Sequence, residues 1–138
     1  IRNFTDDLLN SFPKIRVSGQ NLDIKSDLNS SELVIFFFTQ TSFAESLAYN
    51  RPTINVFSHK DFLITDMAKP YYEDLKKNKI IFESSFEASK FISENYKNLN
   101  GWWNDEKTQR SKNDFLSKFF NQDHDNYKKI YNAVRELL

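Results

Sequence analysis

Apolar and polar residues alternate along the middle of the chain in blocks that switch between strand and helix spacing. The unbroken run Leu33-Val34-Ile35-Phe36-Phe37-Phe38 has the length and the β-branched and aromatic content of a strand, and its continuity is typical of a parallel strand covered on both faces. Further strands are predicted over 53–57 and 79–83, and helices over 42–50, 69–77 and 85–97. Because strands and helices alternate, we expect an α/β fold, a Rossmann-like three-layer domain with a parallel sheet.

The predicted helices each place apolar residues on one side. The inward positions are Phe43, Ala44, Leu47 and Ala48 in the first helix, Tyr72 and Leu75 in the second, and Phe86, Ala88, Phe91 and Ile92 in the third. Ser85 is the expected N-cap of the third helix. If the sheet is parallel, Phe36 and Ile54 should be buried within it.

The two ends of the chain have a different pattern. Residues 1–12 form a short amphipathic segment, Ile15-Arg16-Val17 is a weak strand candidate, and residues 18–31 read as a loop with a short helical turn. After Gly101 the pattern is helical only, which adds C-terminal helices to the domain. Their apolar faces are Phe115, Leu116, Phe119 and Phe120, and then Tyr127, Ile130, Tyr131, Val134 and Leu138.

Length and charge narrow the class of protein. The 138 residues suit one domain over 1–138, and the first residue, Ile1, is not Met, so we expect a fragment of a longer protein. Lys plus Arg and Asp plus Glu both number 19, a balance that argues against nucleic acid as the main partner.

The absence of cysteine excludes a disulfide framework, a thiolate nucleophile and a cysteine-ligated zinc. It also suits a reducing compartment, so we expect a cytoplasmic protein that could work at the inner face of the membrane. The longest apolar run is far too short to span a bilayer.

The turn after the 33–38 strand is the candidate site. With only Gly19 and Gly101 in the chain, neither a dinucleotide-binding glycine motif nor a Walker loop can be written, so an anion must be bound in another way. In a parallel sheet, ligands sit beyond the carboxyl ends of the strands, where helix N-termini offer free N–H groups. Thr39, Thr41 and Ser42 add hydroxyl groups there, and Glu45 could accept hydrogen bonds from sugar or ribose hydroxyls.

The same residues have a purely structural interpretation. Ser42-Phe43-Ala44-Glu45 is a Ser-x-x-Glu capping box, which needs no ligand, and spacing alone favours capping by roughly two to one. The two interpretations are compatible with each other.

Three other features carry weaker signals. His59 and Lys60 follow the 53–57 strand and could face the same cleft, although a lone loop histidine is more often solvated. His124 lies in a polar stretch, and two distant histidines do not suit a metal site, so we expect neither a metal nor a cofactor. Trp102-Trp103 could stack on a ligand, but an anchor in the core is about four times more probable because of the area that a Trp buries.

Parts of the sequence resemble a known class of enzymes. Ser31-Glu-Leu-Val-Ile followed by Thr41-Ser-Phe-Ala-Glu-Ser-Leu-Ala-Tyr-Asn-Arg-Pro-Thr-Ile54 resembles the donor-binding region of GT-B glycosyltransferases. The wider chain is closer still to a family of bacterial transferases associated with surface-carbohydrate synthesis. That resemblance adds Ala68-Lys-Pro-Tyr-Tyr-Glu-Asp-Leu75 and Gly101-Trp-Trp-Asn104, and it covers roughly residues 30–120.

The resemblance implies two Rossmann-like halves, of which this chain would be the C-terminal, donor-binding half. Thr41 and Ser42 match the positions that meet the diphosphate of a nucleotide-sugar donor, and Glu45 matches the one that meets the ribose. The acceptor site and the general base belong to the N-terminal domain in such enzymes. We therefore expect that domain as a partner, and we expect the fragment alone to be inactive.

The leading hypothesis is donor binding in a glycosyltransferase-like enzyme of cell-surface carbohydrate biosynthesis. The alternatives are a sugar-nucleotide epimerase, a polyol-phosphate transferase, or a non-catalytic interaction module that kept the fold. The apolar stripe over 127–138 must be buried somewhere, so in the fragment this helix should pack loosely on its own sheet or mediate self-association.

Overall fold

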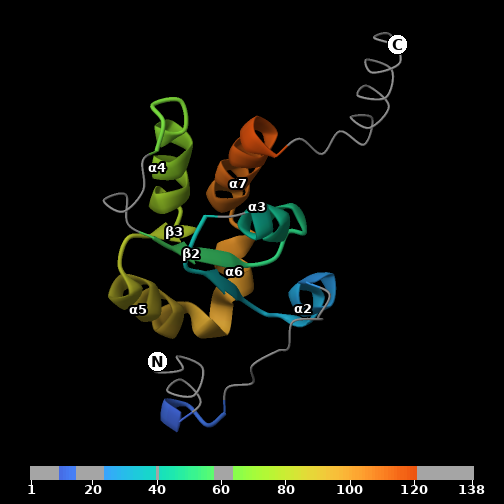
Figure 1. Cartoon of the computed structure of the whole chain (residues 1–138), viewed down its shortest axis with the longest axis vertical. Helices are drawn as coiled ribbons and strands as arrows, with labels where there is room; N and C mark the ends of the chain where they lie inside the picture. Colours follow the sequence, from blue (N-terminus) through green and yellow to red (C-terminus); the bar gives the residue numbers. More distant parts are fainter. Residues whose placement is uncertain (1–9, 15–23, 40, 58–63, 121–138) are drawn as a thin grey trace, which may run out of the picture. The chain divides into compact units, whose positions relative to one another are not determined.

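The computed structural model describes residues 10–14, 24–39, 41–57 and 64–120 (Figure 1). The chain divides into two compact units, residues 1–31 and 32–138. In the first unit, helix α2 (Ile24–Ser30) is the short helical turn expected within 18–31, and the Oγ of Ser31 donates to the carbonyl oxygen of Asp27 at 2.6 Å at its end. The predicted segment over 1–12 and the strand candidate at 15–17 fall largely outside the described residues.

The second unit is built on a parallel sheet. Its elements follow in the order β1 (Val34–Phe36), α3 (Thr41–Ala48), β2 (Thr53–Val56), α4 (Lys69–Lys77), β3 (Ile81–Phe82), α5 (Ser85–Asn95), a 3-10 turn (Tyr96–Asn98), α6 (Leu99–Trp103) and α7 (Glu106–Phe119). The strands lie in the order β1-β2-β3, with Ile35 beside Ile54 and Val56 beside Phe82. The predicted Rossmann-like α/β fold with extra helices after the sheet is confirmed.

Helices cover both faces of this sheet. On one face the largest cluster of buried residues joins α3, α4, α6 and α7, and it includes Phe43, Leu47, Leu75, Ile81, Trp103 and Phe115. On the other face Ile54 and Phe82 pack against Ala88 of α5, with Phe91 and Ile92 partly buried beside them. Successive strand residues point to opposite faces, so the alternation of Ile81 and Phe82 between the two clusters follows from strand geometry.

The expectation that the first strand is covered on both faces is wrong. Only Val34–Phe36 pair with β2, and Ile35 is 43% exposed while Phe37 and Phe38 are more exposed still. The physical reason is that α5 packs on β2 and β3, which leaves the α5 side of β1 uncovered by the described residues. Phe36 points to the other face and is partly buried, with its ring edge-on to Phe43 at 6.1 Å, whereas Ile54 is fully buried as predicted.

In the described part of the chain, two non-glycine residues end helices in the left-handed conformation. Asn50 (φ 55°) follows α3, where the N–H of Arg51 donates to the carbonyl oxygen of Ser46. Lys79 (φ 63°) follows α4, where the N–H of Ile80 donates to the carbonyl oxygen of Leu75. Both ends are Schellman motifs, whose left-handed position is usually glycine. The chain contains two glycines, and here Asn50 and Lys79 occupy the positions where glycine is usual.

Helix α5 begins at Ser85, the first residue of the predicted helix, but its N-cap lies one residue earlier than predicted. Its N-cap is Ser84 in extended conformation and Ser85 is the first helical residue, so the prediction of Ser85 as N-cap is wrong. Phe86 is 75% exposed, also against the prediction, because only Ala88, Phe91 and Ile92 face the sheet. A helix that covers a two-strand surface buries a narrower stripe than the sequence pattern suggested.

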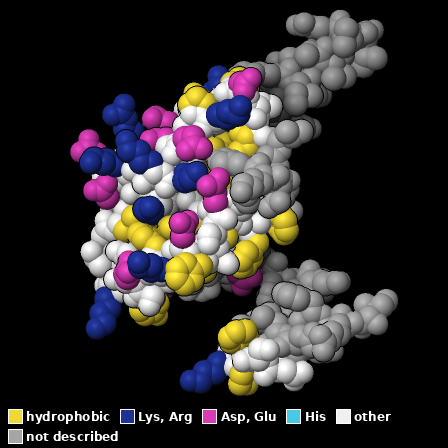
Figure 2. All heavy atoms as spheres, turned by 90° about the vertical axis from the view of Figure 1, so that its left-hand side faces the viewer, with side chains coloured by type: hydrophobic (Ala, Val, Ile, Leu, Met, Phe, Trp, Pro, Cys, Tyr) yellow, Lys and Arg dark blue, Asp and Glu magenta, His cyan; other side chains and the backbone are white. Residues whose placement is uncertain are grey.

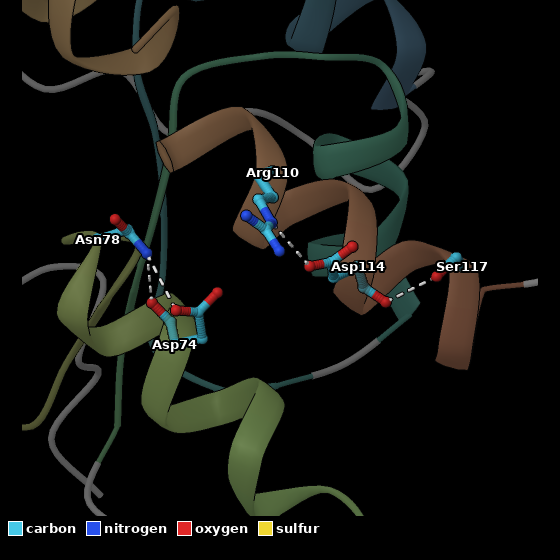
Figure 3. Close-up of polar contacts among 5 residues, drawn as sticks. All are labelled: Asp74, Asn78, Arg110, Asp114 and Ser117. Atoms are coloured by element: carbon cyan, nitrogen blue, oxygen red, sulfur yellow. Dashed lines mark hydrogen bonds and ion pairs between the residues drawn. The ribbon is translucent and has the colours of Figure 1, made fainter. Parts of the chain in front are cut away.

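The C-terminal helices pack on the sheet face that carries α3. Helices α4 and α7 lie side by side (Figure 1), with Tyr71 edge-on to Phe119 and Tyr72 edge-on to Phe115. The polar contacts drawn in Figure 3 stay within each of these helices: Asn78 with Asp74 on α4, and Arg110 with Asp114 and Ser117 with Asp114 on α7. Aromatic packing therefore joins the two helices, and these polar contacts stabilise each one internally.

Residues 127–138, which carry the second predicted apolar face, lie outside the described part of the chain. Within the described part, no helix is both long and apolar enough to cross a membrane.

Candidate functional site

The predicted site residues gather at the turn from β1 into α3. Thr39 is exposed three residues beyond the end of β1, and Thr41 is the first residue of α3. Ser42 is the second residue of the helix, so it lies inside the first turn and the prediction of Ser42 as N-cap is wrong by this register. The helix starts earlier than predicted because Thr41 already takes helical geometry, and Ser42 therefore does not open a capping box.

Glu45 points away from the core side of α3. The buried residues of this helix are Phe43, Ser46 and Leu47, at the spacing of one helical face. Thr41 and Glu45 are four residues apart on the opposite side, where residues at that spacing are neighbours. Glu45 is half-buried, so its carboxylate remains available to a ligand at the start of the helix.

The first turn of α3 offers backbone donors. The first N–H groups of a helix have no partner within the helix, and the helix dipole favours negative charge there. A phosphate or carboxylate at this end would be bound by main-chain groups and by the hydroxyls of Thr41 and Ser42. Binding of this kind needs no glycine-rich loop, which the sequence lacks.

His59, with its neighbour Lys60, lies outside the described residues, and so does His124. The prediction that His59 faces the cleft therefore stays a prediction. Among the residues that are described, no three acidic or histidine side chains come together as a metal site would need.

Two further residues reach the same turn. Asn55, in the middle strand β2, is fully buried, and its Nδ2 donates to the Oγ1 of Thr39 at 2.9 Å. The hydroxyl of Tyr72, on α4, also hydrogen-bonds to the side chain of Thr39. Thr39 thus joins the segment after β1 to β2 and to α4, and these hydrogen bonds form a polar cluster at the carboxyl edge of the sheet.

Burial raises the pKa of Tyr72, and the hydrogen bond with Thr39 offsets part of that rise. The phenol is therefore protonated at neutral pH and can act as a donor. Its ring is held edge-on by Phe57 at 5.6 Å and by Phe115 at 5.7 Å, which fixes the hydroxyl beside Thr39.

A second polar cluster lies at the opposite end of α3. The Nε1 of Trp103 donates to both the carbonyl oxygen and the Oδ1 of Asn50 at 3.1 Å, and the Nζ of Lys112 donates to the same Oδ1 at 2.6 Å. Trp103 is 2% exposed, and the Nε1 of Trp102 donates to the carbonyl oxygen of Asn78. The two tryptophans anchor the core, as the sequence interpretation favoured, and this cluster joins α6 and α7 to the end of α3.

Sequence reasoning did not select Asn55 or Tyr72 for the site. A signal for Asn55 was present, because an amide inside the strand sequence Thr53-Ile54-Asn55-Val56 interrupts an otherwise β-branched pattern. Tyr72 was predicted to face inward, and its role at the edge depends on α4 packing, which no local pattern reveals.

The surface charge is mixed on the side of the molecule that α4 and α5 form. Basic and acidic side chains are interspersed there, with no broad basic area on that face (Figure 2). Lys76 of α4 illustrates this, since its Nζ lies 2.8 Å from a carboxylate oxygen of Glu83.

Comparison with known proteins gives one match. No curated protein and no solved structure matches the chain. The sequence model of the LIC12162 family transferases matches residues 2–133, which is nearly the whole chain and includes β1, the turn at Thr39, α3 and β2. The chain belongs to the LIC12162 family of transferases.

Proposed function

We propose that this chain is the donor-binding half of a glycosyltransferase-like enzyme, and that it binds a nucleotide-sugar at the carboxyl edge of its sheet. The observation that supports this most is the convergence of Thr39, Asn55 and Tyr72 at the turn that leads into the N-terminus of α3. Membership of a transferase family supports group transfer as the reaction class. A parallel sheet carries its ligands at this edge.

Each residue has a separate role in the proposal. The main-chain N–H groups at the start of α3 and the hydroxyls of Thr41 and Ser42 bind the diphosphate, and Glu45 accepts hydrogen bonds from ribose hydroxyls. When the sugar is transferred, negative charge grows on the departing nucleoside diphosphate. The same N–H groups stabilise that charge in the transition state. His59, which follows β2 in the sequence, would contribute to the same site.

The catalytic base and the acceptor site belong to a second, N-terminal domain in this proposal. The reaction serves cell-surface carbohydrate assembly and takes place in the cytoplasm. A polyol-phosphate transferase is the alternative that membership of a transferase family also accommodates, because it too binds a donor that contains a nucleoside diphosphate, although it releases the nucleoside monophosphate as leaving group.

The test is calorimetric titration of the intact protein with UDP, GDP, ADP and CDP, each alone and linked to a hexose. We expect saturable binding of one nucleotide family. In the variant Thr41→Val, affinity for that nucleotide should fall severalfold, because one hydroxyl donor to the phosphates is lost. Thr65→Val, a change at an exposed threonine before α4, is the matched control and should leave affinity unchanged. Absence of binding by every nucleotide would contradict the proposal.

A further inference from the structure

A buried polar side chain at the end of β2 lacks part of its hydrogen bonding. Asn55 is fully buried, and its Oδ1 has no hydrogen-bond partner among the described residues, whereas its Nδ2 donates to Thr39. Buried polar atoms are nearly always paired, and an unpaired one destabilises the fold. Val would suit this strand position without that cost, since β-branched residues favour strands. The presence of Asn therefore calls for a partner that the described residues do not supply.

The direction of this side chain follows from its neighbour two positions earlier. Thr53 and Asn55 point to the same face of the sheet, because side chains alternate along a strand. The Oγ1 of Thr53 lies 2.7 Å from the Oγ of Ser46, so this is the face that α3 covers. Thr53 is fully satisfied there, since its hydroxyl also donates to the carbonyl oxygen of Arg51.

Asn55 lies nearer the carboxyl edge than Thr53, at the level of the turn into α3. Its Nδ2 reaches Thr39 in that turn, and Oδ1 is bonded to the same carbon as Nδ2. The unpaired oxygen is therefore beside the turn that precedes the N-terminus of α3. The Oδ1 of Asn55 is therefore a single hydrogen-bond acceptor that lies close to the N–H donors at the start of α3.

The Oδ1 of Asn55 and the N–H groups at the start of α3 are together complementary to one kind of ligand. A phosphate has only acceptors at its ionised oxygens, so it suits the N–H groups of α3 but cannot pair with the Oδ1 of Asn55. A hydroxyl group can donate to Oδ1. A ligand that satisfies both carries a hydroxyl close to a phosphate.

We propose that the Oδ1 of Asn55 accepts a hydrogen bond from a hydroxyl of the bound donor. Asn55 is then a specificity-determining residue for ligands that carry a hydroxyl group close to a phosphate. This inference rests on the proposed function and names a contact within it. The hydroxyl belongs either to the ribose of the nucleotide or to the transferred sugar, and the two sources share this chemistry.

The experiment compares the intact wild-type protein with Asn55→Val, using the tightest-binding nucleoside diphosphate of the panel above and its hexose conjugate. We expect the variant to lose about five- to tenfold in affinity, the effect of removing one hydrogen bond to a neutral group. A loss for both ligands assigns the hydroxyl to the ribose, and a loss for the conjugate alone assigns it to the sugar. Thr53→Val, on the same strand and face, is the matched control: it should lower the melting temperature and leave affinity unchanged.

A second experiment uses wild-type protein, so its result does not depend on whether a variant folds. Wild-type protein is titrated with deoxy forms of the same ligands, each lacking one hydroxyl, and one of them should lose the same five- to tenfold. Asn55→Val, where it folds, should bind that deoxy form and its parent equally well. If every deoxy form binds the wild type as well as its parent does, or if Asn55→Val binds normally, the inference is wrong while the proposed function stands. Absence of any nucleotide binding overturns both.

Discussion

The Nζ of Lys112 lies 2.6 Å from the Oδ1 of Asn50, so a buried cation of α7 meets the residue that ends α3. The same ammonium lies 5.9 Å from the centre of the Trp103 ring. The carbonyl groups at a helix C-terminus carry partial negative charge, which favours a cation there. This contact fixes the end of α3 opposite to the candidate site, and thereby fixes the direction in which its N-terminus points.

Asn50 contributes through its backbone and its side chain, and two substitutions separate these contributions. Asn50→Gly keeps the left-handed backbone but removes the acceptor for Lys112, and it should cost about 1.5–3 kcal/mol of stability, the value of a hydrogen bond to a charged group. Asn50→Ala adds the strain of a left-handed alanine and should cost about 1 kcal/mol more. Urea denaturation measures both. Equal stabilities for the two variants would contradict the role of the left-handed backbone.

Lys112 should make stability depend on pH at the alkaline end. Burial lowers the pKa of Lys112 below its ordinary 10.5, so the unfolded chain binds more protons than the folded one between the two pKa values. The contribution of this residue to stability therefore rises as pH increases through that window, up to about 10.5. The difference in urea midpoint between the wild type and Lys112→Met should grow with pH in favour of the wild type. Lys118→Met, at an exposed position on the same helix, should show no such trend.

Lys79 is a position at which glycine should stabilise the protein. Its φ of 63° places a side-chain-bearing residue in the left-handed region after α4. Lys79→Gly removes that strain, and after the entropy cost of glycine in the unfolded chain it should gain about 0.5–1 kcal/mol. A thermal melt of the variant measures the gain. A lower melting temperature would indicate that the contact of Lys79 with the ring of Phe82, at 5.9 Å, matters more than the strain.

Ser42→Ala tests the register of α3. Because Ser42 is the second residue of the helix and not its N-cap, the substitution should change stability by less than about 0.5 kcal/mol, whereas loss of a serine cap typically costs about 1 kcal/mol. Thermal melts without ligand decide between the two values. A loss near the larger value would restore Ser42 as the cap.

Local patterns predicted the three strands and the helices between them, because unbroken apolar runs and i, i+3, i+4 spacings report burial directly. They failed where burial depends on a distant element. Ile35 and Phe86 are apolar and exposed, since α5 covers only β2 and β3. The start of α3 and the N-cap of α5 were each misplaced by one residue, because a run of Ser and Thr offers several possible caps.

The site was predictable only in part. The turn from β1 to α3 follows from the strand–helix alternation, which places Thr39, Thr41 and Glu45 near one edge. Asn55 and Tyr72 reach that edge through pairing of β2 with β1 and through packing of α4, and both depend on contacts between residues far apart in the sequence.

The binding of the nucleotide by Glu45 tests the account most directly. Titration of the intact protein should show that Glu45→Gln weakens nucleotide affinity by about 1–3 kcal/mol, because a charge-assisted hydrogen bond to a ribose hydroxyl is lost. Glu87→Gln, a change at an exposed glutamate in the first turn of α5, should bind the nucleotide as the wild type does. Equal affinity of the wild type and Glu45→Gln would contradict the account and leave Glu45 with a structural role alone.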